Sequence, residues 1–347
     1  MGILYQAADP IYWVIWLFVL FALMAFNELG RVKLWCGLAL FALVPIALTL
    51  FVWPETAAPG NEYGTGTWFN WVKTYSALAG CLGFIALRFV KWRGKDGKIH
   101  YLYEKRWALC FPPLILAINI AEAVIRDFQV FGFALWEGGV VENLWTISGP
   151  WNIMNGIAGI LNIITICGWF GIFISKDSSK DMIWPDMIWA WVIAYDLWNF
   201  AYTYNCISDH SAYCGLALLL ACTIPTFFIK RGAWLQHRAQ TLALWIMFVM
   251  TVPQFADVLA PHSDHAQPHG VLCGESARAR LERGACGLPV PSHPQAEAEP
   301  AEGSDLHRHE GLPAHRGGEQ VEIFHPPPGI PCVFARAGSR SCRLGLF

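Results

Sequence analysis

Charged side chains are scarce in this chain, and their scarcity excludes most classes of soluble protein. Only 14% of the 347 residues are charged, whereas 55% are hydrophobic, and the mean hydropathy is +0.38. A soluble domain ordinarily has about 25% charged residues. The formal net charge of −2 contains no basic excess, so the composition does not indicate a nucleic acid as a partner. These values are typical of a polytopic membrane protein whose main partner is the lipid bilayer.

Signatures of the common enzyme classes and of a secretory leader are also missing. The chain contains no Walker-type phosphate loop, no HExxH and no GxSxG motif, so ATP-driven pumps and common hydrolases lack support. No Lys or Arg precedes the first apolar run, and no small-residue cleavage site follows it. We therefore expect that run to be retained as a helix, and we expect no cofactor.

Eight apolar runs are candidates for membrane-spanning helices. All 18 Trp lie at or before Trp245, many near the ends of these runs, as in an interfacial aromatic belt. The sequence predicts an all-α, multi-pass helical bundle over residues 1–260, located in the plasma membrane. The eight predicted spans are Pro10–Asn27, Leu34–Trp53, Trp68–Val90, Trp107–Phe128, Pro150–Ser175, Pro185–Ile207, Ala212–Ile229 and Leu242–Leu259.

Basic residues occur in every second connection between these runs. Connections one, three, five and seven contain Lys or Arg, most densely between Arg88 and Arg106, whereas connections two, four and six contain none. Because membrane proteins retain Lys and Arg on the cytoplasmic side, the alternation predicts that the N-terminus lies outside. It also supports the number of eight spans, since one missed span would break the alternation.

The sixth predicted span carries a carboxylate, Asp196, near its middle. A carboxylate in hydrocarbon is costly, so we expect Asp196 to face the protein interior and to mark a site. A helix turns by about 100° per residue, which places further polar side chains on or beside the same face. These are Tyr195, Asn199, Tyr202, Thr203, Cys206 and His210.

The fourth span carries a second polar face. Asn119, Glu122 and Arg126 are spaced by three and four residues and therefore share one side of a helix. Glu122 and Arg126 are an i, i+4 pair of opposite charge, which we expect to neutralise itself in the membrane. Lys73, near the outer end of the third span, is expected to extend its ammonium group to the membrane surface.

The fifth span carries a third polar face, made of Asn152, Asn155 and Asn162. Gly156 and Gly159 lie beside it and would let a neighbouring helix approach closely. The predicted topology places all three polar faces at one depth. We therefore expect a polar pocket, reached from outside and floored by Asn119, Asn162 and Asp196. In the plainer interpretation, these amides form hydrogen bonds between helices and the Glu–Arg pair is architectural.

Two classes of function remain. The first is a transporter or small-molecule-binding membrane protein that uses this pocket, although no inverted repeat is evident. The second is an intramembrane enzyme in which Asp196 and His210 transfer protons. A retinal protein is excluded because the interiors of spans four to eight contain no Lys. No metal is expected, because His100 and His237 are predicted to be cytoplasmic and His210 external.

Two features remain open from the sequence alone. Cys206 and Cys214 are both predicted near the outer surface, and a disulfide between them is one alternative. Beyond Pro261 the chain has no Trp, Tyr or Lys, and we interpret residues 261–347 as a disordered, low-complexity tail. A metal site at His262, His265 and His269 is the less favoured alternative. A third interpretation is out-of-frame translation after Asp257, with a final helix lost, which translation of the other two frames would test.

The runs WNIMNGIAGILNIITICGWF and WPDMIWAWVIAYDLWNFAYTYNCISDHSAYCG resemble a family of bacterial polytopic membrane proteins known only as a domain of unknown function. The resemblance covers about residues 1–257. It implies a membrane location and no activity, and it therefore assigns no catalytic residue.

Overall fold

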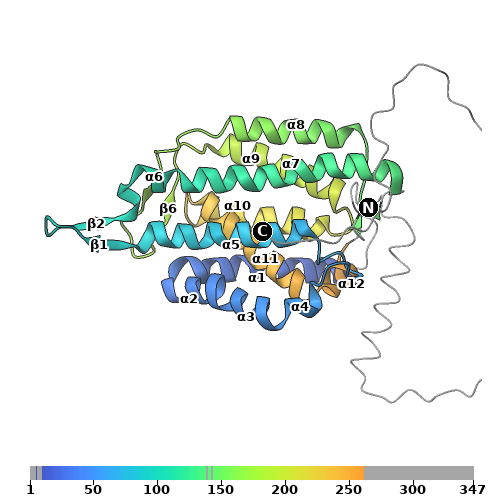
Figure 1. Ribbon diagram of the computed structural model, residues 1–347, viewed down its shortest axis with the longest axis horizontal. Helices are drawn as coiled ribbons and strands as arrows, with labels where there is room; N and C mark the ends of the chain where they lie inside the picture. Colours follow the sequence, from blue (N-terminus) through green and yellow to red (C-terminus); the bar gives the residue numbers. More distant parts are fainter. Residues whose placement is uncertain (1–4, 6–9, 138–139, 142–143, 262–347) are drawn as a thin grey trace, which may run out of the picture. The chain divides into compact units, whose positions relative to one another are not determined.

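Helices make up most of the chain that the computed structural model describes, namely Tyr5 and residues 10–137, 140–141 and 144–261. All of the predicted tail except Pro261 lies outside these residues, including the alternative metal site at His262, His265 and His269. The main helices lie side by side in a bundle (Figure 1). In chain order the helices are α1 (Pro10–Val32), α2 (Leu34–Leu38), η1 (Ala39–Leu43), α3 (Val44–Phe51), α4 (Trp53–Thr56), α5 (Trp68–Phe89), η2 (Leu102–Glu104), α6 (Arg106–Leu109), α7 (Phe111–Glu137), α8 (Pro150–Ile164), α9 (Trp189–Cys206), η3 (Ala212–Ala217), α10 (Leu218–Phe228), α11 (Trp234–Thr251) and α12 (Gln254–Leu259).

Among the described residues, four helical segments are long and apolar enough to cross a membrane. They are Pro10–Val32, Leu34–Phe51, Trp68–Phe89 and Arg106–Gly132, and they coincide with the first four predicted spans. A shorter apolar helix, Ala212–Phe228, occupies the position of the seventh. The helical fold class is therefore confirmed, together with the presence of several apolar helices compatible with a membrane protein.

The fifth predicted span is too long, because α8 ends at Ile164 and not at Ser175. The Thr165 hydroxyl donates to the Leu161 carbonyl at 2.8 Å, and Gly168 then adopts a φ of +64°. A left-handed conformation of this kind is readily available only to Gly, and it ends the helical path. The chain continues through β5 (Phe173–Ile174), which pairs antiparallel with β6 (Met182–Ile183), before α9 begins.

The eighth predicted span begins too late and ends too late. α11 starts at Trp234 instead of Leu242, and it stops at Thr251. Its first turns contain Gln236, His237 and Arg238, whose polarity resembles that of a loop although the structure buries all three. Pro253 lies just beyond the end of α11, and α12 follows as a separate helix. Proline cannot donate the backbone hydrogen bond that would continue the helix.

Two glycines on α8 lie in its contact with α7. A Cβ atom on Gly156 would lie 2.8 Å from Phe128, and one on Gly159 would lie 2.5 Å from Val124. These distances are shorter than a carbon–carbon contact allows. The expectation that Gly156 and Gly159 let a neighbouring helix approach is thus confirmed.

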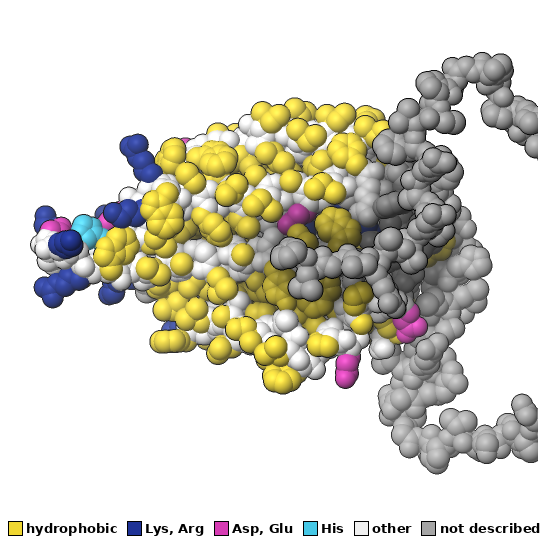
Figure 2. Space-filling model, in the orientation of Figure 1, with side chains coloured by type: hydrophobic (Ala, Val, Ile, Leu, Met, Phe, Trp, Pro, Cys, Tyr) yellow, Lys and Arg dark blue, Asp and Glu magenta, His cyan; other side chains and the backbone are white. Residues whose placement is uncertain are grey.

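A basic hairpin projects from one end of the bundle (Figure 1). It is formed by β1 (Lys91–Arg93) and β2 (Ile99–Tyr101), which pair antiparallel. Lys and Arg side chains gather at this end, whereas the side of the bundle between the two ends is mostly hydrophobic (Figure 2). A third short pair, β3 (Val140–Val141) with β4 (Leu144–Trp145), is also present.

Candidate functional site

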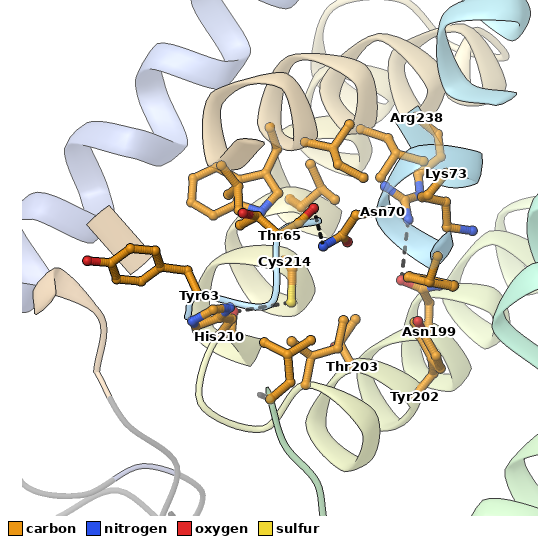
Figure 3. A pocket seen from close by; sticks show the side chains of 18 residues that line it. Tyr63, Thr65, Asn70, Lys73, Asn199, Tyr202, Thr203, His210, Cys214 and Arg238 are labelled. Atoms are coloured by element: carbon orange, nitrogen blue, oxygen red, sulfur yellow. Dashed lines mark hydrogen bonds between the residues drawn. The ribbon is translucent and has the colours of Figure 1, made fainter. Parts of the chain in front are cut away.

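A pocket of about 80 Å³ lies among α5, α9 and α11, and we call it the Lys73–Arg238 pocket. Its wall is apolar along α11, where Leu242, Trp245 and Val249 follow one another on a single face. The polar and sulfur-containing side chains that line it are Tyr63, Thr65, Asn70, Lys73, Asn199, Tyr202, Thr203, His210, Cys214 and Arg238. Figure 3 shows Lys73 and Arg238 at one end of the pocket and Tyr63 and His210 at the other.

The connection before α5 forms one wall of this pocket and is held by side-chain hydrogen bonds. The Thr67 hydroxyl accepts from the backbone N–H of Asn70 and thereby caps α5. The Asn70 amide donates to the carbonyls of Gly64 and Thr65. Asn61 in turn donates to Thr65 and accepts from its backbone. Tyr63 and Thr65 are therefore positioned by a network that is local in the sequence.

Lys73 is buried beside the pocket and is neutralised by a carboxylate from another helix. Its ammonium nitrogen lies 2.9 Å from Oε2 of Glu122 on α7, and it donates to the Asn119 carbonyl at 2.8 Å. The Ser76 hydroxyl donates to the same carboxylate oxygen at 3.3 Å. The expected pairing of Glu122 with Arg126 is therefore wrong, and so is the expectation that Lys73 extends to the membrane surface. Arg126 instead donates to Gln129 at 3.1 Å.

Arg238 is the other buried cation of the pocket, and its contacts are with neutral groups. Its Nη2 donates to the Asn199 amide oxygen at 3.3 Å, and its Nε donates to the Tyr195 hydroxyl at 3.4 Å. The guanidinium carbon lies 5.9 Å from the centre of the Tyr195 ring. Only 6% of the residue is exposed, and Nη1 has no hydrogen-bond partner in the part of the chain that the structure describes.

The structure brings four of the twelve predicted site residues to this pocket, namely Asn199, Tyr202, Thr203 and His210. Tyr195 lies behind it and holds Arg238. Asn119 lines a second, smaller cavity of about 20 Å³ that also contacts Arg238. The predicted floor of Asn119, Asn162 and Asp196 is therefore wrong as a single surface. Asn162 is half-buried on α8 and lines neither the Lys73–Arg238 pocket nor the smaller cavity at Asn119.

Asp196 turns away from the pocket toward α10. It is half-buried, and its Oδ2 accepts a hydrogen bond of 2.6 Å from the Thr223 hydroxyl. Trp234 on α11 donates to the same Thr223 oxygen at 3.2 Å. Asp196 is thus a link in a chain of hydrogen bonds between α9, α10 and α11. It does not line the Lys73–Arg238 pocket, which His210 does.

Asn152 and Asn155 belong to a separate buried cluster centred on Asp127, which the sequence analysis missed. The Asn155 amide donates to one oxygen of the Asp127 carboxylate at 2.8 Å, and the Asn152 amide donates to the other at 3.3 Å. The Cys206 thiol donates to that second oxygen at 3.3 Å. Cys206 and Cys214 are both free thiols, so the disulfide alternative is excluded in this structure. Asp127 lies next to Arg126, outside the three-and-four spacing that drew attention to its neighbours.

A second missed cluster surrounds Asp181 at the opposite end of the bundle from the connection before α5. Arg31 lies 2.6 Å from Asp181, and the Gln236 amide donates to the same carboxylate at 3.1 Å. Arg88 donates to the Arg31 and Ser179 carbonyls at 2.5 and 2.7 Å. These contacts join α1, α5, α11 and the β5–β6 connection. Because the buried cations of this cluster contact a buried carboxylate and backbone carbonyls, we interpret the cluster as a structural link between these elements.

Lys73 and Arg238 are the two Lys or Arg residues that line the pocket, and the sequence analysis did not select either as a site residue. A helical face that continues backwards from Trp245 through Leu242 reaches Arg238 and Trp234 at spacings of three and four, and this periodicity is the signal that would have found it. Among the described residues, no group of three or more His, Cys, Asp or Glu side chains could hold a metal ion. His237 is buried in α11, against Asn27, and not in a cytoplasmic connection as predicted.

Comparison with known proteins places the chain in a family without assigning it an activity. A model of a family of unknown function, DUF5692, matches residues 6–273, which extends past the range of the resemblance noted from the sequence. No curated protein and no solved structure matches the chain. Since the family model covers more than half of the sequence, the protein belongs to the family of unknown function DUF5692.

Proposed function

We propose that this protein is a multi-pass protein of the plasma membrane that binds a small molecule in the Lys73–Arg238 pocket, as a transporter or a receptor. The proposal is based on the composition of this pocket: two buried cations, two amides and several hydroxyls line one cavity. A few convergent polar groups in a mostly apolar cavity are typical of small-molecule sites.

Eight membrane crossings with the N-terminus outside are part of the same proposal. The surface of α1, α3 and α8 is rich in large exposed side chains such as Phe18, Phe51 and Met154, which suit contact with lipid tails. The basic hairpin lies at the end of the bundle that the alternation of charge assigns to the cytoplasm (Figure 2). In this orientation the pocket opens near the connection before α5, on the outer side.

The short helices are compatible with this arrangement. α8 has 15 residues, and α9 and α11 have 18 each, which at 1.5 Å per residue corresponds to about 22–27 Å. The hydrocarbon core is about 30 Å thick. The β5 and β6 strands would complete the crossing at its inner end. Asp181, Met182 and Trp184 are all buried there, and irregular backbone is tolerated at membrane depth when protein covers it.

An experiment on bound ligands tests the proposal. The full-length protein is purified in a mild detergent, and co-purifying small molecules and lipids are identified by untargeted mass spectrometry. Val249 lines the pocket, so Val249→Phe should fill it and remove a specific ligand, whereas Val249→Ala should retain that ligand. A set of molecules identical in all three preparations would contradict the proposal. Reconstitution in liposomes then separates uptake of the ligand from binding alone.

The alternative of an intramembrane enzyme using Asp196 and His210 has less support. His210 lines the pocket, while Asp196 faces Thr223 on α10, so no substrate in this cavity would touch both groups.

A further inference from the structure

Arg238 carries a buried positive charge that forms no ion pair with a described carboxylate, and Asp196 attracts it only from beyond ion-pair distance. Its hydrogen bonds are to Asn199 and Tyr195, and one guanidinium nitrogen, Nη1, is buried without a partner among the described residues. A buried charge without a counter-charge is strongly unfavourable, whereas a paired one is tolerated. Glu122 and Asp196 are the candidate counter-charges for the Arg238 guanidinium.

The two carboxylates closest in the fold are already engaged. Glu122 forms its ion pair with Lys73, so that pair is neutral as a unit. Asp196 lies on the same helix as Asn199, but it accepts from Thr223 and forms no ion pair with Arg238. At the pocket end formed by Lys73 and Arg238, the Arg238 guanidinium therefore has no carboxylate at ion-pair distance among the described residues, and Asp196 offsets its charge only from farther away.

A buried water is the plainest alternative partner for Nη1. The small cavity shared by Arg238 and Asn119 is about 20 Å³, and the Asn119 amide oxygen is also without a partner there. This volume suffices for one water, since a water requires about 10–15 Å³. Such a water would satisfy the N–H group, but it would bring no negative charge. With or without the water, the Arg238 guanidinium therefore lacks an anion at ion-pair distance among the described residues.

The Lys73–Arg238 pocket offers what a small anion requires. Figure 3 shows Arg238 and Lys73 next to each other, with Asn199 and Thr203 on the facing helix. A guanidinium binds carboxylate or phosphate oxygens through paired N–H donors, and the ammonium and amide groups supply further donors. The volume of about 80 Å³ accommodates an anion of a few heavy atoms, or the charged end of a longer molecule along the apolar wall of α11.

We propose that the ligand of this pocket is an anion of the carboxylate or phosphate type, anchored by the Arg238 guanidinium. The inference rests on the proposed function, since it names the chemical class of the ligand for the same site. Two sources can supply such an anion: a free anion from the outer aqueous phase, or the phosphate of an anionic lipid headgroup.

The test is anion-dependent thermal stability of the full-length protein in a non-ionic detergent. Sodium acetate and sodium phosphate are compared with sodium chloride at equal ionic strength, and phosphatidylglycerol is compared with phosphatidylcholine in mixed micelles. A ligand that binds only the folded state raises Tm, here by on the order of 5 °C at saturation. A saturable rise with acetate or phosphate identifies a free anion, and one confined to phosphatidylglycerol identifies a headgroup.

Two variants assign the effect to Arg238. Arg238→Gln removes a buried charge that has no ion-pair partner among the described residues, so it should be at least as stable as the parent without the anion and should lose the anion-dependent rise in Tm. Arg93→Gln, on the exposed hairpin, should retain the rise. If Arg238→Gln does not fold, Arg238→Lys replaces it, and the rise should shift to at least tenfold higher anion concentration because the paired donors are lost.

Two outcomes would overturn the inference, and they are separable from failure of the proposed function. The first is the absence of any anion-specific rise in the parent protein. The second is a rise of equal size in the parent and in Arg238→Gln. If a neutral molecule co-purifies and is lost only in Val249→Phe, the pocket is a binding site and the anion assignment alone fails. If the pocket variants change neither the set of co-purifying molecules nor the anion-dependent rise in Tm, both proposals fail.

Discussion

Lys73 of α5 and Glu122 of α7 form an ion pair of 2.9 Å within the bundle, and each residue is less than 10% exposed. The pair couples two helices that are far apart in the sequence. Of the two cations that line the pocket, Lys73 thus has an ion-pair partner, whereas Arg238 has none among the described carboxylates. The first prediction tests this pairing.

We expect Glu122→Gln to destabilise the protein by about 3–5 kcal/mol, because it leaves the Lys73 ammonium buried without its counter-charge. The double variant Lys73→Gln with Glu122→Gln should recover much of this loss. Glu122→Gln with Arg126→Gln is the matched control and should recover none. Thermal unfolding in detergent measures all three. Recovery with Arg126 instead of Lys73 would contradict the pairing in the structure.

The Asp127 cluster provides the second prediction. Asp127→Ala removes the acceptor of two buried amides, Asn152 and Asn155, and each unpaired group costs about 1–3 kcal/mol. Asn162→Ala, on the same helix α8 but half-buried, should change stability by only about 0.5 kcal/mol. The free energy of unfolding of the two variants is compared under identical conditions. Equal losses would mean that Asp127 is not the centre of a buried network.

The third prediction concerns pH and the connection between β5 and β6. Hydrogen bonds from the Lys230 ammonium and from the Ser179 and Ser175 hydroxyls lower the pKa of Asp177 well below its usual range. A depressed pKa in the folded state stabilises the fold above the unfolded value, near pH 3.9, and this stabilisation is lost as the pH falls through the folded-state pKa. Because Asp177 is exposed, solvent screening keeps the contribution small.

We therefore expect Asp177→Asn to have a slightly lower Tm than the parent at neutral pH. The difference should narrow as the pH is lowered below about 4. Lys176→Gln, in the same connection and also exposed, should follow the parent at every pH. A difference that widens toward acid pH would show that the sign of the shift is wrong.

The sequence predicts those parts of the fold that depend on local composition. The first four spans are continuous apolar runs, and the structure places helices over nearly the same residues. The ends of α8 and the beginning of α11 could not be predicted in the same way. Gly168 adopts a left-handed conformation because the chain turns there, and the local sequence does not reveal that turn. The polar segment from Gln236 to Arg238 resembles a loop until its buried partners, such as Asp181, are known.

The candidate site was only partly predictable, for a related reason. Helical spacing shows which residues share a face, and three of the residues that it grouped, Asn199, Thr203 and His210, line the Lys73–Arg238 pocket. It does not show which face of a neighbouring helix lies opposite. Glu122 has two candidate partners, Arg126 four residues away on α7 and Lys73 on α5. It pairs with Lys73 because α5 packs against α7, and helical spacing within α7 does not reveal that contact. The rotation of α9 likewise turns Asp196 toward Thr223 and not into the pocket.

The last prediction tests the orientation of the proposed membrane topology. Glu62 lies in the connection before α5 and Lys95 on the basic hairpin, and both side chains are exposed. In intact cells, a membrane-impermeant maleimide should label Glu62→Cys and should leave Lys95→Cys unlabelled until the membrane is opened. The parent chain, whose described cysteines include the exposed Cys167, sets the background. Labelling of Lys95→Cys from outside would invert the orientation, and the pocket would then open toward the cytoplasm. Labelling of both sites would contradict the odd number of crossings between them.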